Sequence, residues 1–272
     1  MIRKAVIPAA GRGRRMLEFS HGLPKELLSV GGKSMIQRAV EMHVRSGIER
    51  IAVVLSPDKQ SIRDLLASKR FADPRFRELL DQVELVFFEQ AEPLGVAHAV
   101  SLAREFIGKE PFALVMPDCL LVSETPFLSQ LVQVYSKRPV DMIGFVWLEQ
   151  SRSMQFGNVG LLRVEPVEPP LYRILELSDK GAGSVNFSEP IHPKGFAGGI
   201  YGPDYFDLIP AEPGRTGEID DVPIHQDLIR SGRLYGVELV GIAFDLGNPE
   251  GYRAAERFFS TSRNSSNMNG SR

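Results

Sequence analysis

Short apolar segments alternate with amphipathic segments through the first 150 residues, and this alternation limits the choice of fold more than any other feature. The apolar segments have the length of strands and lie at residues 4–10, 49–56, 82–89, 111–118 and 140–149. Residues 34–47 instead carry apolar side chains at helical spacing, starting at Ser34, an N-cap residue type, and stopping at Gly47. Strands that alternate with helices favour an α/β fold with a mostly parallel sheet and helices on both faces.

The pattern changes in the second half of the chain. From Phe156 onward, short strand-like segments are broken by glycine and proline, which is typical of an added antiparallel part. Helical patterns return at residues 223–232 and 248–259. We expect one domain over residues 1–260, with a core mainly in 1–150, the antiparallel part mainly in 151–235 and a return to the core in 236–260. The tail 261–272 is rich in serine and asparagine, and we expect it to be disordered.

The bulk composition excludes several classes of protein. A formal net charge of −2 argues against broad attraction to nucleic acid or to an anionic membrane. The single cysteine, Cys119, cannot form an intramolecular disulfide and fits a reducing compartment. No apolar run approaches the roughly 20 residues of a transmembrane helix, and the first strand follows the N-terminus without a signal-peptide pattern. We therefore expect a cytoplasmic protein without nucleic-acid or membrane partners.

Residues 8–28 place two glycines among four cations, in a chain that is slightly acidic overall. The small residues Ala10, Gly11 and Gly13 let backbone N–H groups approach a ligand closely. Guanidinium groups make bidentate contacts to phosphate oxygens and an ammonium acts as a compact charge; the cations here are Arg12, Arg14, Arg15 and Lys25. We interpret the segment as a phosphate-binding loop, and the alternative is a solvated basic loop.

Two better-known phosphate motifs do not fit this region. The dinucleotide fingerprint G-x-G-x-x-G has Met16 where its third glycine belongs, and this makes a dehydrogenase the weakest of the candidate functions. The segment "GGKS" ends like a P-loop, but Leu27 occupies the position of the first P-loop glycine. We interpret Gly31 and Gly32 as a tight turn.

Two aspartates, Asp118 and Asp245, each follow an apolar strand segment. Carboxylate oxygens suit Mg²⁺, and two such groups can hold one ion while phosphate oxygens and water fill its other positions. For Asp118 alone, a turn residue after Pro117 is an equally good interpretation. Ligands of parallel sheets bind beyond the carboxyl ends of the strands, so we expect Asp118 at the same sheet edge as Gly11 and Gly13.

Five motifs in order resemble the sugar-nucleotide nucleotidyltransferase family. They are "VIPAAGRGRRM", "PKELL", "EQAEPLGVAHAV", "PD" and "FDLGNPEGY", and they span nearly the whole chain. The pattern is most similar to that of bacterial UTP–glucose-1-phosphate uridylyltransferases. Each motif is modest alone, and their order makes the resemblance strong.

The resemblance implies a Rossmann-like core and a transfer reaction. A sugar 1-phosphate would attack the α-phosphate of a nucleoside triphosphate and release pyrophosphate, with Mg²⁺ as the cofactor. UTP and glucose 1-phosphate are the default pair. The family also forms homo-oligomers, either dimers or tetramers.

The resemblance also assigns roles to individual positions. The catalytic residues would be Arg15, facing the triphosphate, and Lys25; the Mg²⁺ ligands would be Asp118 and Asp245. The nucleotide would contact Ala10, Gly11, Gly13, Gln90, Gly95 and Asp118, with Gln90 hydrogen-bonded to the pyrimidine edge. The sugar would contact Gly157, Glu176, Gly199 and Glu218.

Departures from the family pattern leave alternatives open. Arg14 replaces a threonine of the phosphate loop, and Leu177 replaces the lysine of an E-K-P motif that grips the sugar phosphate. Lys180 and Lys194 are the alternatives for that lost charge. The chain could therefore be an active uridylyltransferase, a thymidylyltransferase that uses dTTP, or an impaired paralogue that binds nucleotide in a regulatory role.

Several other residues receive structural interpretations. We expect Asp220 and Asp221 to precede a helix, with Pro223 in its first turn. We expect His98 to be a packed or capping residue, His225 to lie at the surface and Trp147 to belong to the core.

Overall fold

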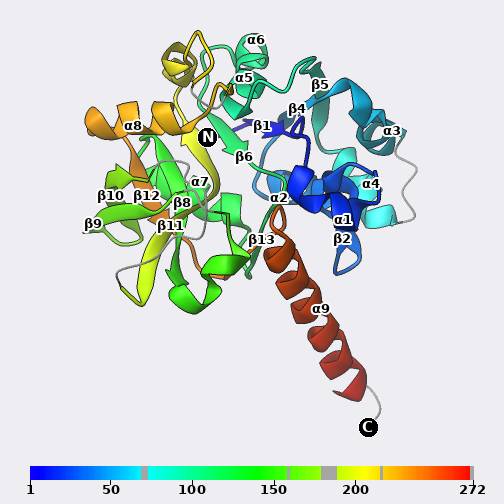
Figure 1. Ribbon diagram of the computed structural model, residues 1–272. Helices are drawn as coiled ribbons and strands as arrows, with labels where there is room; N and C mark the ends of the chain where they lie inside the picture. The colour runs from blue at the N-terminus through cyan, green and yellow to red at the C-terminus, as the bar shows by residue number, and fades with distance from the viewer. Residues whose placement is uncertain (69–72, 158–159, 179–188, 215–216, 270–272) are drawn as a thin grey trace.

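The computed structural model describes residues 1–68, 73–157, 160–178, 189–214 and 217–269. Its centre is a nine-stranded sheet with the order β5-β4-β1-β6-β11-β8-β12-β10-β9 (Figure 1). The strands are β1 (Lys4–Pro8), β4 (Arg50–Leu55), β5 (Glu84–Glu89), β6 (Phe112–Val115), β8 (Met142–Glu149), β9 (Leu162–Glu168), β10 (Leu171–Leu177), β11 (Ile191–Tyr201) and β12 (Tyr235–Glu238). Two small sheets pair β2 (Ser29–Val30) with β3 (Lys33–Ser34) and β7 (Cys119–Val122) with β13 (Ile242–Asp245).

The sheet has a parallel part and an antiparallel part. The four strands β5, β4, β1 and β6 are parallel. β11 then runs antiparallel to both β6 and β8, β12 is parallel to β8, and the β10–β9 hairpin follows antiparallel. The expected α/β class, with a parallel core and an antiparallel addition, is confirmed. The addition continues the same sheet and does not form a separate layer.

Helices cover both faces of this sheet (Figure 1). They are α1 (Leu17–Ser20), α2 (Met35–Arg45), α3 (Gln60–Ser68), α4 (Pro74–Leu80), α5 (Val96–Ser101), α6 (Arg104–Ile107), α7 (Phe127–Lys137), α8 (Val222–Arg230) and α9 (Pro249–Asn269). The start of α2 follows from its sequence: Ser34 Oγ accepts from the Gln37 N–H, and Gln37 Oε1 accepts from the Ser34 N–H at 2.9 Å. This reciprocal capping satisfies two N–H groups that the helix itself leaves unpaired.

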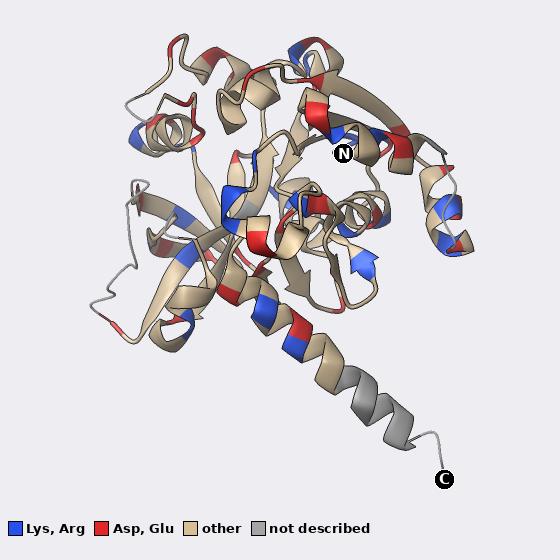
Figure 2. Cartoon of the chain, turned by 45° about the vertical axis from the view of Figure 1, so that its right-hand side comes forward, with Lys and Arg blue, Asp and Glu red and all other residues tan. Residues whose placement is uncertain are grey.

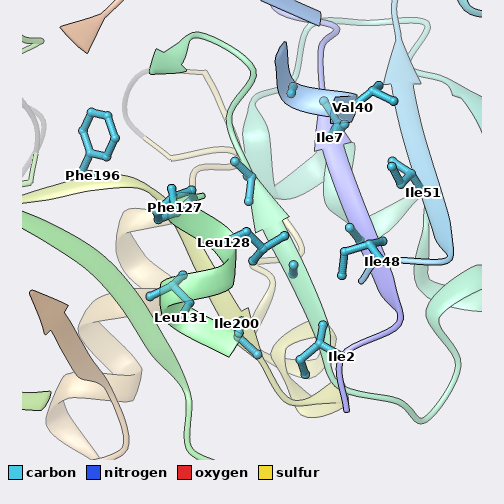
Figure 3. Packing of buried hydrophobic residues seen from close by; sticks show 14 of the residues in the cluster. Ile2, Ile7, Val40, Ile48, Ile51, Phe127, Leu128, Leu131, Phe196 and Ile200 are labelled. Atoms are coloured by element: carbon cyan, nitrogen blue, oxygen red, sulfur yellow. The ribbon is translucent and has the colours of Figure 1, made fainter. Parts of the chain in front are cut away.

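The parallel strands are buried on both faces, which explains their continuous apolar runs. Alternate residues of β1 show this directly: Ile7 packs with Val40 of α2, whereas Val6 faces the cluster that contains Val100 of α5. Figure 3 shows the first of these clusters, in which Leu128 of α7 also lies. The loop after β1, which the sequence predicts to bind phosphate, therefore begins at the end of a strand that is packed on both faces.

The structure corrects two expectations, those for His225 and Trp147. α9 ends at Asn269 and projects away from the rest of the chain (Figure 1). The expected disorder of the tail 261–272 stays a prediction. His225 is buried, because α8 packs that face on the sheet, and Trp147 is 45% exposed.

Lysine and arginine are interspersed with aspartate and glutamate over the chain in the view of Figure 2. Among the described residues, no helix combines the length and the apolar character needed to cross a membrane.

Candidate active site

A cavity of about 580 Å³ lies at the carboxyl ends of the parallel strands. It is bordered by the loop after β1, by Gln90 after β5 and by the segment Met116–Asp118 after β6. Eight of the predicted site residues line it: Ala10, Gly11, Gly13, Lys25, Gln90, Gly95, Asp118 and Glu218. Arg12 and Arg14 line it as well, so most of the cations that were singled out in the loop gather there.

The buried side chain of Lys59 holds the loop after β1 through two of its backbone carbonyl groups. Its Nζ donates to Ala9 O at 2.6 Å, to Gly11 O at 2.7 Å and to Glu26 Oε2 at 2.8 Å. Lys59 is 3% exposed and Glu26 is 1% exposed. In a planar trans peptide the N–H points opposite to the C=O, so the amides of Ala10 and Arg12 point away from Lys59. Sequence reasoning missed Lys59, although it follows a parallel strand, β4, at the ligand-binding edge.

Lys25 and Asp118 form an ion pair on the cavity wall. Lys25 Nζ lies 2.5 Å from Asp118 Oδ2. Burial acts to lower the pKa of Lys25, but the attraction of Asp118 and Glu26 outweighs burial and holds this pKa above its usual value. Burial acts to raise the pKa of Asp118, and the Lys25 charge and hydrogen bond lower it overall. The pair is therefore charged on both sides near neutral pH.

Asp245 meets this pair from a different part of the chain. The backbone N–H of Leu246 donates to Asp118 O at 2.7 Å, which joins the two aspartate segments. A Cβ atom at Gly247 would lie 2.4 Å from Asp118 Oδ2 and 3.3 Å from Asp245 Oδ1, so both carboxylates border the same small space. Burial, and next the Asp118 charge, raise the pKa of Asp245. Two like charges this close favour a cation between them.

Arg15 approaches the same carboxylates. A Cβ atom at Gly157 would lie 3.3 Å from both Arg15 Nη1 and Asp245 Oδ2, and the Gly157 N–H donates to Asp245 Oδ2 at 2.7 Å. Gly157 therefore fits tightly between a cation and a carboxylate. Arg15, Lys25, Asp118 and Asp245 form one charged cluster.

The two carboxylates suit Mg²⁺, a hard cation that keeps several waters and takes one or two protein carboxylates plus phosphate oxygens. Among the described residues, no group of three or more His, Cys, Asp or Glu side chains is arranged to hold a metal ion by itself. Asp118 and Asp245 would thus hold the ion only together with substrate oxygens and water.

The remaining sugar-site candidates are dispersed. Glu176 is exposed and pairs with Arg163 across the β10–β9 hairpin. Gly199 lies inside the sheet, where a Cβ would meet Met142 O at 2.1 Å. Glu218 lies beside Gly95, whose added Cβ would be 3.0 Å from the Glu218 Cβ. The structure brings only Gly157 of these four candidates to the charged cluster.

A second cavity lies at Leu177, the position where the family pattern has the lysine of its E-K-P motif. Leu177 lines this second cavity of about 210 Å³, and Met116 lines both cavities, so the two are adjacent. Lys194 is buried, and Asp245 attracts its charge, although burial lowers the pKa of Lys194 overall. Lys180, the other alternative, falls outside the described residues.

Gln90 and Gly95 adjoin on the wall of the cavity. Gly95 has φ +100°, and a Cβ there would lie 2.6 Å from Ile219 O, so only glycine fits this turn. Gln90 Nε2 donates to Gly95 O at 3.0 Å and lies 2.8 Å from His98 Nδ1. Gln90 and Gly95 thus line the same cavity as Lys25 and Asp118 of the charged cluster.

Known proteins are similar to this chain over nearly its whole length. The profile of the family described as Nucleotidyl transferase matches residues 4–260. A putative UTP–glucose-1-phosphate uridylyltransferase of Bacillus subtilis is 32% identical in an alignment of 264 residues that covers 93% of this chain and 94% of the relative. A UTP–glucose-1-phosphate uridylyltransferase of Pseudomonas aeruginosa is 30% identical over 273 residues, covering 95% and 96% of the two chains.

Solved structures agree with this result. The crystal structure of a UDP-glucose pyrophosphorylase complexed with UDP-glucose has a TM-score of 0.82 and 26% sequence identity, and the match covers 96% of this chain and 100% of that one. The UTP-bound enzyme of Acinetobacter baumannii has a TM-score of 0.75 and 25% identity, over 95% and 93% of the chains. This chain belongs to the nucleotidyl transferase family.

Proposed function

We propose that this chain transfers a uridylyl group from UTP to glucose 1-phosphate and releases pyrophosphate in an Mg²⁺-dependent reaction. The observation that carries the proposal is the charged cluster described above, because two of its members, Lys25 and Asp118, line the cavity that also contains Gln90. The names of the relatives from Bacillus subtilis and Pseudomonas aeruginosa support the same pair of substrates.

The reaction is an exchange of bonds at the α-phosphorus. An oxygen of the sugar phosphate bonds to the α-phosphorus, while the bond from that phosphorus to the bridging oxygen breaks and pyrophosphate leaves with the electron pair. The attacking oxygen is already ionised near neutral pH, so no side chain has to remove a proton. The protein is required to hold two anions together and to neutralise their charge.

The residues of the cavity suit these two tasks. The amides of Ala10 and Arg12, turned away from Lys59, are donors for phosphate oxygens. Lys25 and Arg15 neutralise charge where the phosphates meet. Mg²⁺ held by Asp118 and Asp245 would supply further charge neutralisation at the phosphates.

The test measures pyrophosphate release with Mg²⁺, supplying UTP, dTTP, CTP, GTP or ATP together with glucose 1-phosphate or another sugar 1-phosphate. Release with UTP and glucose 1-phosphate is the expected result, and Lys25→Met should lower its rate about 10²–10³-fold. Lys109→Met is the matched control, because Lys109 is exposed and precedes β6 at the opposite edge of the sheet.

Other results would select the alternatives. Preferential use of dTTP would identify a thymidylyltransferase. Binding of UTP without release for any sugar would refute the transfer activity and favour the nucleotide-binding paralogue, for which the departures at Arg14 and Leu177 would be the first explanation to test.

A further inference from the structure

The side chain of Gln90 is held in one orientation inside the cavity. It is 3% exposed, and its backbone N–H donates to Leu55 O at 2.8 Å, which anchors it after β5. Its amide nitrogen has two neighbours, Gly95 O at 3.0 Å and His98 Nδ1 at 2.8 Å. Among the described residues, no hydrogen-bond donor contacts Gln90 Oε1.

The chemistry of these neighbours determines which way the amide faces. A backbone carbonyl only accepts hydrogen bonds, so the side of Gln90 that faces Gly95 O must be the NH₂ group. The second hydrogen of that group then points to His98 Nδ1, which accepts it when the imidazole is neutral and carries its proton on Nε2. Both donors of the amide are used within the protein, and the oxygen that remains is an acceptor.

An acceptor at this place discriminates between pyrimidines. Uracil and thymine carry a hydrogen on ring nitrogen N3, which can donate to Gln90 Oε1. Cytosine has a lone pair at N3, and two acceptors facing each other leave both unsatisfied. Polar sites of this kind reject an analogue that cannot complete the hydrogen bond far more strongly than apolar sites reject a change of size.

We propose that His98 is a positioning residue that selects the base by holding the Gln90 amide with its oxygen toward the nucleotide. This inference rests on one part of the proposed function, the binding of a pyrimidine nucleotide in the cavity. It does not depend on the transfer reaction. His98 lies in α5, whose first residues border the cavity, so its ring reaches the amide from the helix that forms the wall. Without His98 Nδ1, one hydrogen bond to Gly95 O is left to orient the amide.

The experiment compares two substitutions of similar size. Asparagine at position 98 keeps an acceptor, Oδ1, close to the place of the imidazole Nδ1, whereas leucine has none. Calorimetry gives the dissociation constants of UTP and CTP for the wild type, His98→Asn and His98→Leu. The readout is the ratio of the two dissociation constants, because a general disturbance of the fold weakens the binding of both nucleotides equally.

We expect the wild type and His98→Asn to prefer UTP strongly, and His98→Leu to lose about tenfold of that preference, the equivalent of one hydrogen bond. An unchanged ratio in His98→Leu, or an equal loss in both variants, would overturn the proposal. Equal affinity of the wild type for UTP and CTP, or no binding of either, would overturn it as well.

The transfer reaction is judged separately, by pyrophosphate release. A wild type that prefers UTP in calorimetry but releases no pyrophosphate would refute the transfer activity and leave the role of His98 intact. Pyrophosphate release with both UTP and CTP, together with equal affinity for the two nucleotides, would support the transfer activity and overturn the role of His98.

Discussion

Replacing Lys59 by methionine tests the support of the phosphate loop. The substitution keeps the length of the side chain and removes the ammonium that contacts Glu26 and two loop carbonyls. Glu26 would remain buried without this partner, and removing one member of a buried ion pair costs about 3–5 kcal/mol. Since each kcal/mol lowers the melting temperature of a chain of this size by about 2–4 °C, we expect a decrease of about 6–20 °C.

Urea unfolding followed by circular dichroism measures the effect. The double variant Lys59→Met with Glu26→Gln should regain most of the lost free energy of unfolding, because no buried charge is left alone. The exposed Lys109→Met should change this free energy by less than about 0.5 kcal/mol. If the single and double variants are equally destabilised, or if Lys59→Met costs less than about 1 kcal/mol, the reasoning about the buried pair is wrong.

Four further predictions concern the cavity and the histidines. Lys25→Met should lower the rate of pyrophosphate release about 10²–10³-fold while circular dichroism stays unchanged, as for the loss of a charge-stabilising donor. Gly11→Ala should leave the melting temperature the same or higher, since no atom lies within 4 Å of the added Cβ, but calorimetry should show weaker UTP binding because that space is the cavity; undiminished binding would remove Gly11 from the site. Asp245→Asn should raise the Mg²⁺ concentration needed for half-maximal release, and an unchanged requirement would argue against this ligand. Burial lowers the pKa of both His43 and His225 to about 4, so between pH 4 and 6.5 the unfolded state binds more protons and stability falls as the pH drops. The free energy of unfolding, measured with urea, should be lower at pH 5.5 than at pH 7.5 by about 1.4 kcal/mol for each histidine. In His43→Leu, this decrease should be smaller by the contribution of one histidine.

Much of the fold could be predicted because local and global signals agree. The apolar segments identified β1, β4, β5, β6 and β8, with ends that moved by one to three residues, and Ser34 marked the start of α2. The gathering of Gly11 and Asp118 also followed from topology, since each comes after a parallel strand. Residues that leave the same sheet edge meet whatever their separation along the chain.

Other parts of the site depend on geometry that the pattern does not contain. The face on which Glu176 lies depends on a register shift between Ile174 and Glu176, which breaks the alternation of side chains. Lys59 and Glu26 are both charged, and their burial becomes understandable only once they are seen to neutralise each other. The contact of His225 Nε2 with Tyr201 at 2.7 Å likewise depends on how α8 packs.

The antiparallel strand β11 limits how this protein can move. It pairs with β6 from Gly198 to Tyr201 and with β8 on its other side. Strand β11 therefore joins the parallel part of the sheet to the strands that follow it in the sheet order. Gly198 fits so closely that a Cβ would lie 1.9 Å from Leu114 O. A hinge between the two parts would have to break these hydrogen bonds and open a buried core. Closure around the substrates is therefore expected to come from movement of loops, while the sheet keeps its strand register.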